Sequence, residues 1–168
     1  MAQEQQSSPP NLRPYNGGCH CGAVRYRALL DPTNLGAARC NCTICHKKGG
    51  LILQLSDETL SLVKPSSYDS AELGDYTFGS GSAHHYFCKT CGISVFSRGK
   101  EVKFVSVNGL TVDQGVADEE GKLDLSKVKI GYWNGLTDDW DEGRAAGVFD
   151  DDDDDDDEEE EEESVGVP

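Results

Sequence analysis

The chain has 168 residues, of which 36% are hydrophobic and 19 are glycine, so it has the size and composition of one globular domain. This composition excludes disorder throughout, and no stretch approaches the roughly 18–20 apolar residues of a membrane-spanning helix. The first 16 residues are polar and rich in proline, without the apolar centre of a secretory signal, so we expect a cytoplasmic protein.

The net charge of −16 is concentrated at one end of the chain, because residues 150–163 are all acidic. Of 31 acidic residues, 14 form this run, which leaves 17 against 15 Lys and Arg. The rest is nearly neutral and has no basic footprint for phosphates, so we expect no nucleic-acid partner. The acidic run predicts an extended tail that keeps the protein soluble, or alternatively contacts a basic partner or inhibits the protein's own site.

These features predict three segments, which are a flexible leader (1–16), a domain (17–148) and a disordered acidic tail (149–168). Within the domain the hydrophobic pattern repeats every second residue, as in β-strands, and no dozen residues show a clear amphipathic helix. Glycine and turn residues at short intervals favour a mainly β fold of folded-over sheets with little helix. The predicted strands are 23–28, 51–55, 60–63, 75–78, 84–87, 93–96, 102–107 and 128–133.

Seven cysteines occur in three groups along the chain. The groups are Cys19-His-Cys21, Cys40-Asn-Cys42-x-x-Cys45 and Cys88-x-x-Cys91. An odd number does not suit a closed set of disulfides, and we expect the thiols to be reduced inside a cell. Cysteines at i, i+2 or i, i+3 can direct two sulfurs at one tetrahedral ion, which favours zinc.

The seven sulfurs divide naturally into four and three. A site of Cys19, Cys21, Cys88 and Cys91 would be closed and structural. Such sites bind metal with roughly 10–16 kcal/mol, which matches the whole stability of a domain, about 5–15 kcal/mol. Loss of the metal should therefore unfold the domain. The remaining Cys40, Cys42 and Cys45 would leave a fourth position for substrate. The alternative is a second closed site, completed by His46, His84 or His85.

A small anionic thiol would suit such an open site, since a metal-bound thiolate stays nucleophilic near neutral pH. Cationic residues and glycines surround the motif, with Arg39 before it and His46, Lys47, Lys48, Gly49 and Gly50 after it.

Three segments together resemble the glutathione-dependent formaldehyde-activating enzyme family, also known by its centromere-protein-V-type domain. They are Gly-Gly-Cys-His-Cys-Gly-Ala-Val-Arg-Tyr (17–26), Cys-Asn-Cys-Thr-Ile-Cys (40–45) and Phe-Cys-Lys-Thr-Cys-Gly (87–92), in the family's order. The resemblance covers about residues 17–134. It implies an Mss4-like β fold with two zincs per chain, one structural on Cys19, Cys21, Cys88 and Cys91, and one catalytic on Cys40, Cys42 and Cys45.

The resemblance also implies a carbon–sulfur lyase that joins formaldehyde to glutathione. A thiolate held at the three-cysteine zinc would attack the aldehyde, and His46 or Lys47 would stabilise the developing alkoxide. Two alternatives stay open, because a fold does not fix a function. One is a zinc enzyme of the same fold that isomerises or cleaves a larger metabolite, and the other is a non-catalytic binding module whose acidic tail docks a partner.

Five further residues have open roles in this interpretation. His84 and His85 are adjacent on a predicted strand, so one should face inward, toward the zinc or into the packing. Arg98 either pairs with a substrate carboxylate or lies exposed at a strand end. Trp133 and Trp140 either line a pocket or pack as core and loop residues.

Overall fold

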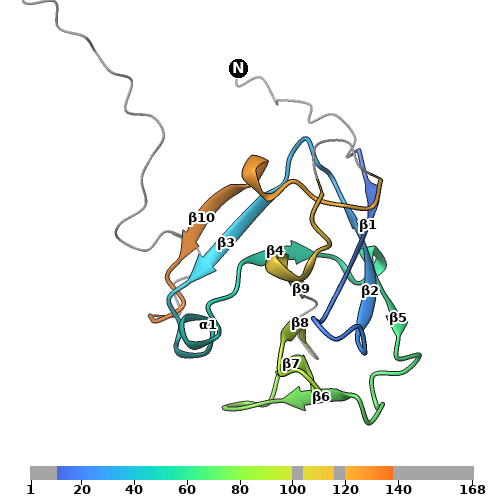
Figure 1. Cartoon of the computed structure of the whole chain (residues 1–168). Helices are drawn as coiled ribbons and strands as arrows, with labels where there is room; N and C mark the ends of the chain where they lie inside the picture. The colour runs from blue at the N-terminus through green and yellow to red at the C-terminus, as the bar shows by residue number, and fades with distance from the viewer. Residues whose placement is uncertain (1–10, 100–103, 116–119, 138–168) are drawn as a thin grey trace, which may run out of the picture.

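The computed structural model describes residues 11–99, 104–115 and 120–137, and these form two β-sheets (Figure 1). The smaller sheet has three strands in the order β1-β2-β5, and the larger has seven in the order β10-β3-β4-β9-β8-β7-β6. The described part of the chain is therefore mainly β, as the sequence predicts, with a single short α-helix within it. The acidic tail and Trp140 lie outside the described residues.

The smaller sheet is antiparallel and turns one face toward the core. Its strands are β1 (Arg13–Gly18), β2 (Arg25–Leu30) and β5 (Leu60–Lys64). Tyr26, Ala28 and Leu30 alternate along β2 and are at most 2% exposed, which confirms the predicted alternation. The leader prediction is wrong for residues 13–16, because Tyr15 is buried and draws this segment into β1.

The larger sheet is antiparallel except where its edge strand β10 runs parallel to β3. Its core face carries Leu53, Phe96, Val105 and Val107, each at most 2% exposed. Its strands are β3 (Gly36–Cys40), β4 (Ile52–Leu55), β6 (Leu73–Tyr76), β7 (Ala83–Cys88), β8 (Ser94–Gly99), β9 (Val105–Asn108) and β10 (Lys129–Trp133).

The core lies between the two sheets and includes one buried polar pair. The Tyr26 ring meets the Phe96 ring edge to face, with centroids 6.5 Å apart, and the Tyr26 hydroxyl is 3.0 Å from Oγ1 of Thr111. Burial raises the pKa of the Tyr26 hydroxyl, so this group stays neutral. Gly17 allows this packing, because a Cβ there would overlap the Tyr26 ring and lie 2.8 Å from the Thr111 carbonyl oxygen.

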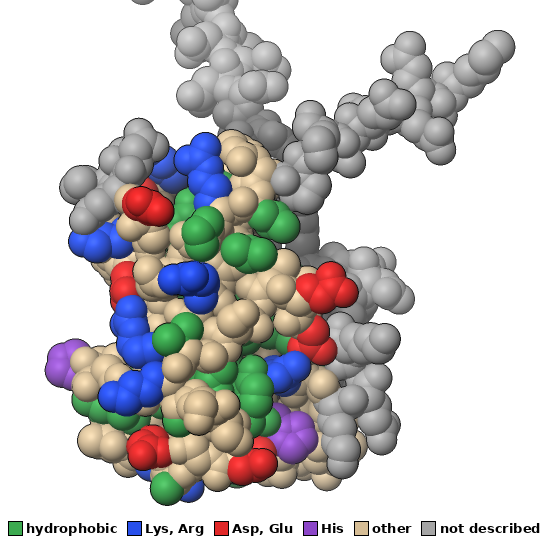
Figure 2. Space-filling model, turned by 90° about the vertical axis from the view of Figure 1, so that its right-hand side faces the viewer, with side chains coloured by type: hydrophobic (Ala, Val, Ile, Leu, Met, Phe, Trp, Pro, Cys, Tyr) green, Lys and Arg blue, Asp and Glu red, His purple; other side chains and the backbone are tan. Residues whose placement is uncertain are grey.

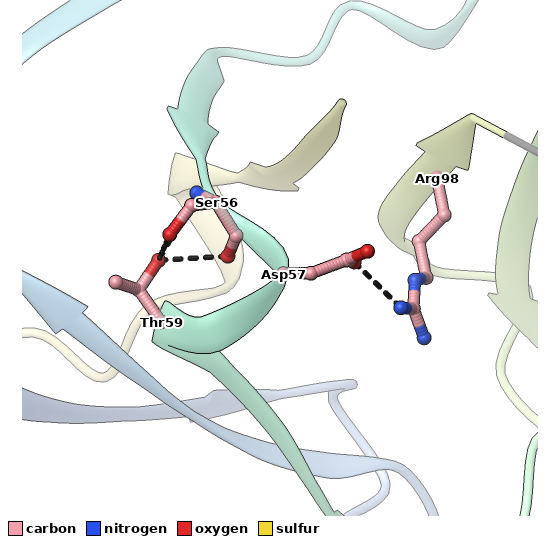
Figure 3. A network of polar contacts seen from close by, with 4 residues as sticks. All are labelled: Ser56, Asp57, Thr59 and Arg98. Carbon is pink, nitrogen blue, oxygen red and sulfur yellow. Dashed lines mark hydrogen bonds and ion pairs between the residues drawn. The ribbon is translucent and has the colours of Figure 1, made fainter. Parts of the chain in front are cut away.

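Arg98 at the end of β8 is engaged within the protein. Its Nη2 donates to Oδ1 of Asp57 at 2.6 Å, and its guanidinium lies 4.8 Å from the centre of the Tyr68 ring. Asp57 begins the 3₁₀ turn Asp57–Thr59, which Ser56 and Thr59 stabilise with reciprocal hydrogen bonds (Figure 3). Arg98 therefore joins the two sheets where the chain passes from β4 to β5, which differs from both expected roles.

The surface beside the smaller sheet has a mixed character. Figure 2 shows cationic and anionic side chains interspersed there, with small apolar areas between them. Among the described residues, no helix has the length and apolar character needed to cross a membrane.

Candidate metal centres

Cys19, Cys21, Cys88 and Cys91 come together as a four-cysteine cluster. The first two follow β1, Cys88 ends β7, and Cys91 lies in the turn before β8. Sγ of Cys21 is 3.6 Å from Sγ of both Cys19 and Cys88, and all the sulfurs lie within 4.8 Å of one another. Four thiolates at about 2.3 Å from a tetrahedral zinc are about 3.8 Å apart, so this geometry fits zinc.

Tight turns aim these sulfurs inward and surround them with N–H groups. Gly22 and Gly92 have φ of 76° and 75°, which glycine adopts without strain. The Val24 N–H donates to Sγ of Cys19 at 3.2 Å. A hydrogen bond from the N–H of Cys21, more than any other interaction, lowers the pKa of the Cys91 thiol to about 6. Within the cluster a proton is thus lost from Cys91 before Cys21, whose pKa is raised to about 11 because the hydrogen bond from the N–H of Ala23, which lowers it, is outweighed by burial and the neighbouring thiols together.

Cys40, Cys42 and Cys45 form a second group, the three-cysteine cluster, with sulfurs again within 4.8 Å. Cys40 ends β3, Cys42 is the N-cap of α1 (Thr43–Lys48), and Cys45 lies within that helix. Among the described residues, neither cluster includes a histidine nitrogen or a carboxylate oxygen. This arrangement gives no support to a site closed by His46, His84 or His85, and it leaves a tetrahedral ion one position for another ligand.

Asn41, which the sequence analysis missed, anchors the loop that carries the three-cysteine cluster. Its N–H donates to the carbonyl of Trp133 at 3.2 Å, and its side-chain amide donates to Oδ1 of Asn134 at 2.9 Å. Its Oδ1 accepts from the N–H of Leu136 at 2.9 Å. The only available signal was the position of this Asn between two cysteines. Trp133, half-buried at the end of β10, contributes its backbone to this anchor.

The three thiols of this cluster titrate differently. Burial raises the pKa of Cys45, and the neighbouring thiols raise it further. Burial acts in the same direction on Cys42, but the N–H of Cys45 and the thiols of Cys45 and Cys40 outweigh it, so the pKa of Cys42 is lowered. A proton is therefore lost first from Cys42, the residue at the helix N-terminus.

Helix α1 places the predicted cationic residues in its exposed last turn, which ends at Gly49 with φ of 62°. His46 and Lys47 are exposed there, and their predicted role as oxyanion donors stays a prediction. Lys48 is three residues after Cys45 and so is its neighbour on the helix surface. Although the residue as a whole is exposed, desolvation of its ammonium group lowers the pKa of Lys48, whereas the Cys45 and Cys42 thiolates raise it.

The two adjacent histidines on β7 point to opposite sides of the larger sheet, as the alternation predicts, but the buried one, His85, is on the side away from the core residue Val105. His84 is half-buried, and its Nδ1 lies 2.7 Å from Oδ2 of Asp75. His85 is only 8% exposed and pairs with Ser97 at 2.9 Å through Nδ1. Burial, followed by the charge of Lys48, lowers the pKa of His85 to about 4, so its ring is neutral at pH 7.

Comparison with known proteins finds similarity over most of the described residues. Residues 14–130 match the family model described as glutathione-dependent formaldehyde-activating enzyme. A curated Halomonas elongata protein named "Putative glutathione-dependent formaldehyde-activating enzyme" is 36% identical over 87 residues, which are 48% of this chain and 53% of that protein. The chain thus spans about half the length of this curated relative.

A solved structure is also similar to this chain. It is the crystal structure of a Rhodobacter sphaeroides protein, with a TM-score of 0.52 and 28% sequence identity. The similarity covers 62% of this chain and 96% of the solved one.

Proposed function

Because the chain belongs to the glutathione-dependent formaldehyde-activating enzyme family, we propose that it is a zinc-dependent carbon–sulfur lyase that joins a glutathione-type thiol to formaldehyde or a similar small aldehyde. The observation that carries this proposal is the three-cysteine cluster, to which no histidine or carboxylate in the described residues adds a fourth ligand. We further propose two zincs per chain, with the four-cysteine cluster holding the structural one.

In the proposed reaction the thiol sulfur forms a bond to the aldehyde carbon. The carbonyl π electrons move to oxygen, and the proton lost by the thiol ends on that oxygen, which gives an S-hydroxymethyl product. A zinc bound by Cys40, Cys42 and Cys45 would supply Lewis acidity that keeps a thiol deprotonated near neutral pH. In the reverse direction the carbon–sulfur bond breaks, so the same site releases aldehyde.

The protein's own residues have two tasks in this proposal. Asn41 fixes the loop of Cys40 and Cys42 against the segment after β10, which keeps the three sulfurs in place. His46 or Lys47, both exposed in the last turn of α1, would donate a hydrogen bond to the developing alkoxide. Since a thiol adds to formaldehyde without help, the acceleration to be measured is modest.

The test is exchange NMR at equilibrium, which measures the interconversion of glutathione and S-hydroxymethylglutathione with and without protein. The zinc-loaded protein should accelerate exchange, and Cys42→Ser should abolish the acceleration while the circular dichroism spectrum is retained. Thr43→Ser, an exposed neighbour in α1, is the matched control and should behave as the unmodified protein does. Unfolding of Cys42→Ser would refute the open-site assignment, and absence of acceleration by the zinc-loaded protein would refute the reaction.

A further inference from the structure

Helix α1 begins at the three-cysteine cluster and ends in a group of cations. Cys42 is its N-cap, and its last turn carries His46, Lys47 and Lys48, all of which are exposed. At a rise of about 1.5 Å per residue, Lys48 lies about 9 Å along the helix axis from Cys42. We call His46, Lys47 and Lys48 the α1 cations. A ligand that enters the cluster therefore does so beside two ammonium groups.

The strands next to α1 add positive charge and no carboxylate. β3 and β10 pair side by side and run toward α1 (Figure 1). Residues 33–56 and 125–137, which include these elements, contain no Asp or Glu, and they add the exposed Arg39 and Lys129. Described carboxylates form ion pairs elsewhere on the molecule, but within the described residues none of them pairs with an α1 cation. The positive charge at this end of the larger sheet is therefore uncompensated by that part of the chain.

The chain leaves the described residues at this same surface. The side-chain amide of Asn41, between two cysteines of the cluster, donates to Oδ1 of Asn134, and its Oδ1 accepts from the N–H of Leu136, both at 2.9 Å. The last described residue, Thr137, directly follows this anchor, and the acidic run 150–163 begins 13 residues after it. Thirteen residues span at most about 45 Å, so the acidic run can reach every part of α1.

The acidic run has the charge that the α1 cations lack as a partner. It consists of 14 consecutive carboxylates. Attachment within reach of α1 raises its local concentration there to about the mM range. An exposed ion pair favours the docked state by only about 1.4- to 5-fold, but the run offers several carboxylates to each cation. Charge and attachment point together favour contact within one chain.

We propose that the acidic run docks on the α1 cations of its own chain and covers the fourth position of the three-cysteine cluster, so that it competes with ligands that enter there. The competition rests on the proposed function, because it needs a thiol at this cluster, whereas the docking does not. Salt, or a polycation that binds the run, should release the site. The acidic run would then be an internal inhibitor of the site.

Docking is tested by comparing the zinc-loaded full chain with a neutral-tail variant, which carries Asp→Asn and Glu→Gln throughout 150–163. In nitrogen–proton correlation spectra, the N–H signals of Lys47, Lys48 and Gly49 should differ between the two proteins at low salt. They should coincide at about 1 M salt, where the screening length is about 3 Å. The signal of Lys64, an exposed lysine on β5 of the smaller sheet, is the control and should be the same in both. Absence of these differences, or differences that grow with protein concentration and so indicate docking on a second copy, would overturn the proposal.

Competition is measured with cobalt(II)-loaded protein, whose thiolate-to-cobalt absorption band gives the Kd of the uncharged thiol 2-mercaptoethanol. At low salt the neutral-tail variant should bind this thiol about four-fold more tightly, from about two-fold for each of two lysine ion pairs, and the difference should vanish at about 1 M salt. Lys48→Gln in the unmodified tail should tighten binding about two-fold, and the matched control Lys64→Gln should not change it.

The two measurements separate this inference from the proposed function. An unchanged Kd in the neutral-tail variant would overturn the competition. A gain for the anionic thiol 3-mercaptopropionate without one for 2-mercaptoethanol would also overturn it, because the run would then act through its field without covering the site. If neither protein binds a thiol while the α1 signals still respond to the tail, the proposed function fails and the docking is supported.

Discussion

The four-cysteine cluster should stabilise the fold more than the three-cysteine cluster, because it closes a far longer loop. Cys21 and Cys88 are 67 residues apart and belong to different sheets, so a metal there joins β1 to the β7–β8 hairpin. In the chain-entropy model for cross-links, a loop of this length contributes about 4.4 kcal/mol. The loop from Cys40 to Cys45 contributes about 2 kcal/mol on the same basis.

The comparison uses Cys88→Ser/Cys91→Ser against Cys42→Ser/Cys45→Ser, each of which removes two ligands from one cluster. Urea unfolding of zinc-loaded protein, followed by far-ultraviolet circular dichroism, gives the unfolding free energies. The first variant should be less stable than the second by at least about 2.4 kcal/mol, or about 1 M in midpoint for m near 2 kcal/mol/M, and a first variant that is already unfolded without urea also meets this expectation. Equal midpoints, or the reverse order, would refute the loop argument and would mean that both clusters stabilise the fold through local contacts alone.

Three further predictions concern packing and pH. Gly17→Ala should lower the unfolding free energy by about 1–3 kcal/mol in the same urea assay, because the added methyl group displaces the Tyr26 ring. The control Gly36→Ala should leave this free energy unchanged, because the space around Gly36 is open. Tyr26→Phe should cost about 1 kcal/mol by removing a buried hydrogen bond, read as a melting temperature a few degrees lower; an unchanged value would show that this bond adds nothing. The pKa of His85 is lowered to about 4 in the folded protein. Below about pH 6.5 the unfolded chain therefore binds a proton at His85 that the folded chain does not bind. The unfolding free energy should fall by up to about 3 kcal/mol as the pH drops from about 6.5 toward 4. His85→Gln should remove this slope, and parallel pH profiles of the two proteins would contradict it.

Local pattern accounts for what the sequence predicts well. The strands predicted at 23–28 and 93–96 are confirmed as β2 and β8, but only the first alternates in burial, since the adjacent Val95 and Phe96 are both buried. The division of the seven cysteines into four and three is also predicted from their spacing. The structure brings the four cysteines of the first and third motifs together, and the three of the middle motif form a separate cluster. The match of residues 14–130 to the family model agrees with the same motifs.

Long-range pairing accounts for what the sequence does not predict. Strand β3, Gly-Ala-Ala-Arg-Cys, has weak strand character and forms because β4 and β10 flank it. The role of Asn41 depends on Asn134 and Leu136, more than 90 residues away, so no local window contains it. Arg98 likewise pairs with Asp57 across a distance of 41 residues. Strand register likewise places His85, Ser97 and Ser106 opposite one another in the larger sheet, although they come from separate strands.

The anchoring of Asn41 by the segment after β10 sets an order of events during synthesis. The ribosome makes Asn134 after 93 more residues, a delay of about 5–20 s at usual elongation rates. All four ligands of the four-cysteine cluster precede that point, since the last is Cys91. A nascent chain can therefore bring the four-cysteine cluster together while the three-cysteine cluster is still on a loop that lacks this anchor. The anchor of that loop forms last, when β10 adds to the edge of β3.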